Sequence, residues 1–449
     1  MSLPDFCFVH AADLHLGSPF SGIIAGSELA AQRLVSASNR ALDALVRLCN
    51  ERRAAFLVLA GDVFDSTSVD VRTQYQLYSA LSSLAHEGIP SFVSWGNHDP
   101  LGSWRATFNW PPEVHFFGAD VGWHEVRSSG RTIAVVGGVS YARPEVNDNL
   151  SLKFRRPPHP HGDHDPDRCL CVGVLHCNVG VVPEHGNYAP CSLNDLAAAG
   201  IDYWALGHVH RHKVLAGPDE GVTGASSFAA VYPGATQGRD ITETGAHGCC
   251  VVHVSGGRVA DIEFVPTDDL RWLNLTIDTG AMRGLDEIVS TVAASCSAEC
   301  AQSGLDAVAV RVRLFGRGGL HRELSRQGAG QVERWLRESL EHEGRAAGRW
   351  WWLESVQDAT APDIDRAALK RSGGLVAELI EAANRLSESA ADLESLVRSI
   401  EQELGPPRAR AALASLSVDE VRDIVAEAET YALDLLLAGE GEAGGGESA

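Results

Sequence analysis

Five short apolar runs in the first half of the chain each end in a loop that carries side chains able to bind a metal ion. The loops read ADLHLGS, LAGDVFD, WGNHD, VLHCNVG and LGHVH, in this order. Their candidate metal ligands are Asp13, His15, Asp62, Asn97, His176, His208 and His210. One fold can serve all of them if it brings the carboxyl ends of several strands to one edge of a sheet, where the loops meet over a common crevice. The pattern therefore predicts an α/β fold with a shared site.

The alternation of apolar runs with helical patterns indicates the same class of fold. Strand-like runs occupy residues 6–10, 55–60, 91–95, 132–136, 170–176 and 203–206, and helical patterns over about 28–52 and 69–87 separate the early ones. Strand–helix–strand alternation is typical of a largely internal sheet. After His210 the pattern changes to short strands with Gly turns, which suggests a second sheet packed on the first. We therefore expect a four-layer α/β/β/α sandwich over residues 1–268.

The rest of the chain is expected to form three further parts. Residues 269–356 combine strand and helix patterns and indicate a small α+β domain. Its Trp350–Trp352 run can stack on nucleic-acid bases, but alternation along a strand favours core packing for at least two of the three. Residues 357–438 place apolar side chains at helical spacing beside an acidic face, which fits either packing on the chain itself or docking of a partner. Residues 439–449 have little to bury and are expected to be disordered.

Composition limits how the chain can meet a ligand. Its 449 residues carry a formal net charge of −22, so contact with nucleic acid would have to be local, metal-bridged or shared with a partner. Ten cysteines without a CxxC pair indicate reduced thiols and a cytoplasmic location. No apolar run reaches about 18 residues, and the first strand follows directly on MSLPD, so we expect neither a membrane span nor a signal peptide. Residues 155–168, rich in Pro, His and Asp, are expected to form a solvated loop.

The spacing of the candidate ligands favours two adjacent metal ions. Asp13 and His15, as D-x-H, let a carboxylate and an imidazole reach the same ion. His208 and His210, as H-x-H, can direct one imidazole to each ion. Asp62 has two carboxylate oxygens and can bridge ions about 3.5–4 Å apart. Two metals on oxygen and imidazole ligands are typical of phosphate-ester hydrolysis.

Taken in order, ADLHLG, GDVFD, GNHD, LH and GHVH resemble the five-motif signature of the calcineurin-like metallophosphoesterases. Within that family, FVHAADLHLGSPF, DYWALGHVH and VYPGATQGRDITETGAHGC resemble the DNA-repair exonucleases of the SbcD type and, more closely, of the YhaO type. The resemblance covers residues 5–268 strongly, the following small domain weakly and the C-terminal helices by position alone.

The resemblance also implies roles for individual residues. One ion would be held by Asp13, His15, Asp62 and His210, and the other by Asp62, Asn97, His176 and His208. Nitrogen and oxygen ligands without thiolate suit Mn²⁺, with Fe or Zn as alternatives. His98 is the candidate general acid that protonates the leaving sugar oxygen, and Asp99 is expected to orient an imidazole. Asp65 stands where much of the nuclease family has a histidine, so it either orients His98 or adds a charge that alters substrate handling. Arg239 either contacts a substrate phosphate or lies on the surface.

The function that the resemblance implies is a Mn²⁺-dependent DNA exonuclease, also acting as an endonuclease, in DNA double-strand-break repair. The chain would act as a homodimer beside an SbcC-like coiled-coil ATPase, with residues 269–356 capping the site and selecting DNA ends. Two alternatives stay open. One is a phosphodiesterase for cyclic nucleotides or small phosphodiesters, and the other is a non-catalytic scaffold for the ATPase. A phosphoprotein phosphatase is disfavoured, because GNHE would be expected where GNHD stands.

Overall fold

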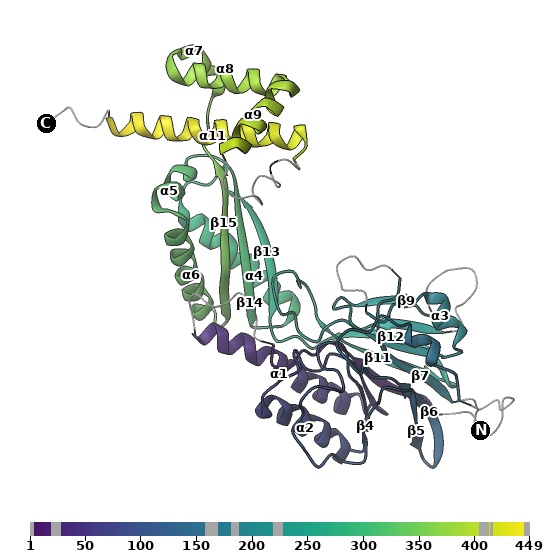
Figure 1. The fold of residues 1–449 in the computed structure, drawn as a ribbon. Coiled ribbons are helices and arrows are strands. Elements are labelled where there is room, and N and C mark those ends of the chain that lie inside the picture. The colour runs from purple at the N-terminus through teal and green to yellow at the C-terminus, as the bar shows by residue number, and fades with distance from the viewer. Residues whose placement is uncertain are drawn as a thin grey trace. The chain divides into compact units, whose positions relative to one another are not determined.

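The computed structural model of the chain forms two compact units (Figure 1). It describes residues 4–18, 28–157, 169–180, 188–218, 228–403, 413 and 416–443. The first unit comprises residues 1–274, 295–311 and 341–354, and the second comprises residues 275–294, 312–340 and 355–449. All candidate metal ligands belong to the first unit. The expected solvated loop over residues 155–168 lies outside the described residues from position 158 onward.

The first sheet of the first unit contains six strands in the order β12-β11-β1-β2-β3-β4. Their bounds are Phe6–Ala11 for β1, Leu57–Ala60 for β2, Ser91–Ser94 for β3, Val114–Phe116 for β4, Gly248–Ser255 for β11 and Arg258–Pro266 for β12. Strands β1 to β4 are parallel, and β11 is antiparallel to both β1 and β12. The carboxyl ends of β1, β2 and β3 therefore lie along one edge of this sheet.

The second sheet also contains six strands, in the order β5-β6-β7-β8-β10-β9. Their bounds are Gly122–Ser128 for β5, Arg131–Gly138 for β6, Leu170–His176 for β7, Tyr203–Gly207 for β8, Lys213–Ala216 for β9 and Ala229–Tyr232 for β10. The prediction that this sheet begins after His210 is wrong, because β5 to β8 already belong to it, and β11 and β12 return to the first sheet. Strand β11 lies between β1 and β12, and this internal position buries most of its side chains on both faces.

The two sheets pack face to face and carry helices on their outer faces. Inner-facing side chains such as Phe8, Phe92 and Tyr203 form one buried core between the sheets. Helices α1 (Glu28–Glu51) and α2 (Val71–His86) cover the outer face of the first sheet. The short helix α3 (Leu193–Ala198) and the 3₁₀ helix η1 (Leu150–Lys153) pack on the outer face of the second. The predicted α/β/β/α sandwich is confirmed, with a thin fourth layer.

A third sheet follows, with the strand order β13-β14-β15. Its strands span Arg271–Asp278, Ala307–Arg317 and Trp350–Ala361, and its helices α4, α5 and α6 span Leu285–Ser303, Leu320–Gln327 and Ala329–Ala346. All three strands run from residues of the first unit into residues of the second. Trp351 and Trp352 are each 5% exposed, so the prediction that at least two of these tryptophans pack in a core is confirmed.

The C-terminal residues form a helical group within the second unit. Helices α7, α8, α9 and α11 span Arg366–Ser372, Gly374–Glu388, Ala390–Glu403 and Val418–Ala443. Ala383, Leu393 and Val421 share a small core, and Arg366 pairs with the buried Glu429 at 2.7 Å. Helix α11 reaches Ala443, so residues 439–443 of the expected disordered tail lie in a helix; residues 444–449 lie outside the described part. None of the described helices is long and apolar enough to cross a membrane.

Candidate metal centre

Five strand ends of the first unit bring the predicted ligands together. Asp13, Asp62 and Asn97 follow β1, β2 and β3 of the first sheet, while His176 ends β7 and His208 follows β8 of the second. Backbone hydrogen bonds tie the first two loops side by side, from the Asp13 amide to the Gly61 carbonyl at 3.1 Å and from the His15 amide to the Asp62 carbonyl at 3.0 Å. Side chains from both sheets therefore meet at one edge of the sandwich.

Four of the seven predicted ligands occupy left-handed backbone. The φ angles are 52° at Asp13, 44° at His15, 47° at Asp62 and 100° at His208. Non-glycine residues rarely adopt such angles, and each costs on the order of 1–3 kcal/mol unless the surroundings hold it in place. Backbone strain at several candidate metal ligands that lie at one edge of the sandwich is typical of a functional site.

The glycines before these ligands leave room for the side chains. Gly61 has a φ of +89°, and a Cβ atom there would overlap the His176 imidazole. A Cβ at Gly96 would overlap the Asp62 carboxylate, and one at Gly207 would overlap the Ala60 carbonyl. Any side chain at these three positions would displace a ligand or the loop that carries it, so the glycines are part of the site's construction.

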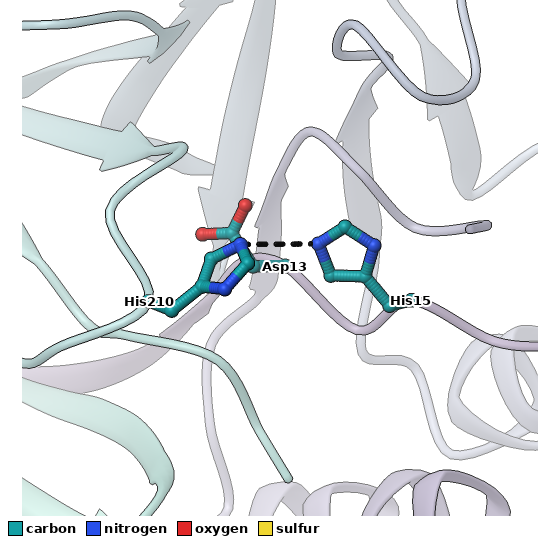
Figure 2. Close-up of side chains that lie close together, drawn as sticks. All are labelled: Asp13, His15 and His210. Atoms are coloured by element: carbon teal, nitrogen blue, oxygen red, sulfur yellow. Dashed lines mark hydrogen bonds between the residues drawn. The ribbon is translucent and has the colours of Figure 1, made fainter. Parts of the chain in front are cut away.

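One group of ligand atoms comes from Asp13, His15 and His210 (Figure 2). These atoms lie within 4.8 Å of one another, and the two imidazole Nε2 atoms face each other at 3.2 Å. The Asp13 carboxylate also accepts the His208 amide hydrogen, at 3.1 and 3.0 Å for its two oxygens. This bond fixes the carboxylate relative to the loop after β8.

A second group comes from Asp62, His176 and His208 and shares the same 4.8 Å limit. Asn97 joins it, because its Oδ1 atom lies 3.0 Å from His176 Nε2. Asp62 Oδ2 lies 3.3 Å from His176 Nε2 and 3.9 Å from His15 Nε2, so one carboxylate faces both groups. This is the arrangement that a bridging ligand requires.

The hydrogen bonds around these imidazoles show that the site fits cations. His15 Nδ1 lies 2.9 Å from an Asp65 oxygen, and His210 Nδ1 lies 2.6 Å from a Glu243 oxygen. Because a carboxylate accepts, His15 Nδ1 carries its proton toward Asp65. His210 Nδ1 lies beside two groups, the Glu243 oxygen and, at 3.0 Å, the Arg239 Nη2 donor. When Nδ1 is protonated toward the closer Glu243 oxygen, the Nε2 atoms of both rings present lone pairs to each other. His176 Nδ1 likewise donates to the Ala60 carbonyl at 3.0 Å, which directs Nε2 toward acceptor oxygens. Converging acceptors need a proton or a metal ion between them.

The pKa shifts describe the competition between protons and metal ions. Burial disfavours a charge on His176, but the Asp62 carboxylate outweighs it and raises the pKa of His176 to about 9. Burial raises the pKa of Asp13, while His176 opposes this shift. Burial also acts to raise the pKa of Asp62, yet the neighbouring His176 holds that pKa well below its ordinary value. A divalent cation would replace the proton that these groups otherwise share.

His98, the candidate general acid, lies at the rim of the two groups. Its amide donates to Asp62 Oδ1 at 2.9 Å, and its Nδ1 donates to the Asp65 carbonyl at 2.8 Å. The ring is partly exposed and stands edge-on to His15, with ring centroids 4.8 Å apart. One of its nitrogens also lies within 4.8 Å of ligand atoms of His15 and Asp62, so proximity alone fits either a proton donor or a ligand.

The structure corrects the role expected for Asp99 and adds a contact with His15 to the role expected for Asp65. Asp99 orients backbone, not an imidazole, because its oxygens accept the amides of Phe64 at 2.9 Å and Gly96 at 2.8 Å. The two carboxylate oxygens of Asp99 thereby link the loop after β2 to the loop after β3. The Asp65 carboxylate contacts His15, and it is the Asp65 carbonyl that meets His98.

Three further residues support the metal ligands through hydrogen bonds, and the sequence motifs did not assign this supporting role to any of them. Tyr141 is buried and donates its hydroxyl to the His176 carbonyl at 2.8 Å. Glu243 holds His210, and Arg239 lies between Glu243 and Asp65 at 3.2 and 3.0 Å. The signal for Arg239 and Glu243 was their place in the TQGRDITETGAHG segment, while Tyr141 had no motif around it.

This two-sheet sandwich with Asp and His clusters at its strand ends is the arrangement of a metal-dependent phosphoesterase. The family profile described as calcineurin-like phosphoesterase matches residues 7–212, and the profile described as the middle domain of metallophosphoesterase YhaO matches residues 272–361. The chain belongs to the calcineurin-like metallophosphoesterase family, whose fold implies bound divalent metals. It is accordingly a metal-dependent phosphoesterase.

Individual relatives refine this placement. The chain is 30% identical to the metallophosphoesterase YhaO of Bacillus subtilis over 430 residues, which cover 95% of this chain and 97% of that protein. It is 24% identical over 316 residues to the SbcD component of the nuclease SbcCD from the same organism, covering 63% of this chain and 74% of the relative. It is also 24% identical over 305 residues to the DNA double-strand break repair protein Mre11 of Methanopyrus kandleri, covering 60% and 59%.

Proposed function

We propose that the chain is a Mn²⁺-dependent DNA nuclease, with exonuclease and endonuclease activity, in the repair of double-strand breaks. The observation that carries the proposal is the convergence of two acceptor-rich groups on the shared carboxylate of Asp62. Two metals held about 3.5–4 Å apart are the common means of phosphodiester cleavage. The similarity to the SbcD component of SbcCD and to Mre11 supports DNA as the substrate.

The proposed ligand sets follow the two groups. Asp13, His15, Asp62 and His210 would hold one ion, and Asp62, Asn97, His176 and His208 would hold the other. The donors are imidazole nitrogens and carboxylate or amide oxygens, with no thiolate among them. This donor set suits Mn²⁺ better than it suits a thiolate-preferring metal, and Fe or Zn are chemically compatible alternatives.

When bound, the two ions supply a water that is deprotonated at neutral pH and offset the negative charge that builds on the phosphate oxygens. The protein's own residues carry the remaining steps. Asp62 and Asp13 set the spacing of the two groups, and backbone amides hold both carboxylates in place. His98 donates a proton from Nε2 to the leaving sugar oxygen, while its Nδ1 stays bonded to the Asp65 carbonyl.

The parts beyond the sandwich are proposed to serve substrate and partner. Residues 269–356 would cap the site and select DNA ends, and residues 357–438 would dock an SbcC-like coiled-coil ATPase. Exposed apolar side chains on the helical group support the docking role, with Leu375 67% exposed and Tyr431 68% exposed. The net charge of −22 supports a partner that provides basic contacts to DNA. The resemblance to the SbcD-type and YhaO-type nucleases also leads us to propose that the chain forms a homodimer.

Purified chain, assayed with Mn²⁺ on end-labelled duplex, on single-stranded DNA and on bis-p-nitrophenyl phosphate, tests the proposal. We expect degradation of DNA that requires Mn²⁺, stops with EDTA and is lost in Asp62→Ala. Turnover of the aryl diester with no cleavage of either DNA substrate, even with the ATPase added, would overturn the nuclease proposal and leave a small-phosphodiester hydrolase. DNA repair that survives His98→Ala in cells would instead favour a scaffold.

A further inference from the structure

Three charged side chains outside the ligand groups form one connected network behind His15 and His210. The network consists of Asp65, Arg239 and Glu243, whose side chains are 15%, 19% and 12% exposed. Arg239 donates to Asp65 Oδ1 at 3.0 Å through Nη1 and to Glu243 Oε1 at 3.2 Å through Nη2. The planar guanidinium matches two carboxylates at once, which a lysine ammonium cannot do with the same geometry.

We propose that Arg239 and Glu243 are positioning residues for the metal centre, which together with Asp65 fix the imidazoles of His15 and His210 for metal binding before an ion arrives. Asp65 Oδ1 accepts from His15 Nδ1 at 2.9 Å, and Glu243 Oε1 accepts from His210 Nδ1 at 2.6 Å. Each carboxylate thereby directs the opposite ring nitrogen toward its partner across 3.2 Å. Without the network, either ring could turn or change tautomer, and the acceptor pair would be lost.

Arg239 offsets the repulsion between the carboxylates of Asp65 and Glu243. Two carboxylates placed behind two neighbouring imidazoles would repel each other, and neither is well exposed to water. The guanidinium bridges them and lowers that repulsion, while the network as a whole keeps one net negative charge next to the rings. A residual negative charge makes the imidazoles better electron donors to a cation.

The turn that carries these residues is itself held from two sides. The Arg239 amide donates to Glu243 Oε2 at 2.8 Å, which closes the turn on its own carboxylate. On the other side, Trp272 Nε1 donates to the Gly238 carbonyl at 2.9 Å, and the Gln237 carboxamide oxygen accepts the Asp269 amide at 2.8 Å. These anchors stand at the start of β13 within the first unit, so the network has a rigid support.

The inference rests on the proposed metal ligands and not on DNA as the substrate. Isothermal titration of MnCl₂ into the metal-stripped full-length chain tests it. We expect Glu243→Ala to weaken one of the two binding events by about 10–100-fold, as loss of a partner of a ligand imidazole commonly does. Glu243→Gln should lose less Mn²⁺ affinity, because its amide oxygen still accepts from His210. Arg239→Lys should bind Mn²⁺ more weakly than the wild type, because an ammonium cannot bridge two carboxylates with the same geometry.

Glu263→Ala is the matched control, because it removes a carboxylate from an arginine pair with Arg52 at 2.6 Å on β12, outside the ligand groups. It should bind Mn²⁺ as tightly as the wild type. Thermal unfolding in EDTA should show that the apo variants keep their fold. Wild-type affinity in both Glu243→Ala and Glu243→Gln would overturn the positioning role. A wild type that binds no Mn²⁺ would overturn the metal centre too, whereas a wild type that binds two ions and leaves DNA intact would refute the nuclease proposal alone.

Discussion

Replacing His98 with alanine tests the assignment of the general acid. The change removes an imidazole whose Nδ1 donates to the Asp65 carbonyl at 2.8 Å, but it keeps the backbone amide that holds Asp62 at 2.9 Å. The shared carboxylate should therefore stay in place. A positioned acid commonly contributes about 10²–10⁴-fold to the rate. Because each tenfold change is about 1.4 kcal/mol, the variant should raise the barrier by about 3–5 kcal/mol.

The choice of leaving group separates proton donation from other roles. A sugar alkoxide leaving from DNA needs a proton, whereas p-nitrophenolate leaves without one. We expect His98→Ala to lose about 10²–10⁴-fold in kcat on DNA and less than about tenfold on bis-p-nitrophenyl phosphate, with unchanged metal content. His86→Ala, which removes another imidazole bonded to a backbone carbonyl, is the control and should leave both activities unchanged.

Equal losses on the two substrates would refute the general-acid assignment. Loss of one metal ion in His98→Ala would refute it in a different way. It would mean that His98 is a ligand, as its place within 4.8 Å of ligand atoms of His15 and Asp62 also permits.

Three further predictions concern the bridge, the support of the site and the docking surface. Asp62→Ala should lose both ions, because its carboxylate faces both groups, and full occupancy by elemental analysis would contradict the bridging assignment. Tyr141→Phe should lower the free energy of unfolding in EDTA by about 1–3 kcal/mol, measured with urea, because the buried His176 carbonyl loses its donor; an unchanged midpoint would count against this contact. Leu375→Asp should abolish capture of the purified ATPase while both ions stay bound; retained capture would exclude that part of the helical group as the docking surface.

The ligand loops could be predicted from the sequence because local signals were strong. Each lies at the end of a short apolar strand, and observed strands such as β2 at Leu57–Ala60 and β7 at Leu170–His176 fall within the runs that defined them. Parallel strands place their carboxyl ends at one edge of each sheet, and the packing of the two sheets then brings the five loops together. Gly61, Gly96 and Gly207 stand beside these loops because a side chain at any of them would overlap a ligand or the strand that carries one.

The strand order and the outer contacts of the site could not be predicted in this way. Strands β11 and β12 return to the first sheet beside β1, and no local pattern encodes which sheet a buried strand joins. Glu243 is an acid in a polar turn, and its role depends on His210, 33 residues earlier in the chain. Asp99 was expected to meet an imidazole, but it satisfies backbone amides instead, because two tight loops leave those donors without partners.

Anomalous diffraction at the manganese edge, from crystals of the Mn²⁺-loaded chain, is the most direct test of a dinuclear centre. We expect two peaks about 3.5–4 Å apart, with the carboxylate of Asp62 between them. One peak should contact Asp13, His15 and His210, and the other should contact His176 and His208. A single peak, no peak, or two peaks of which either does not touch Asp62 would contradict the account.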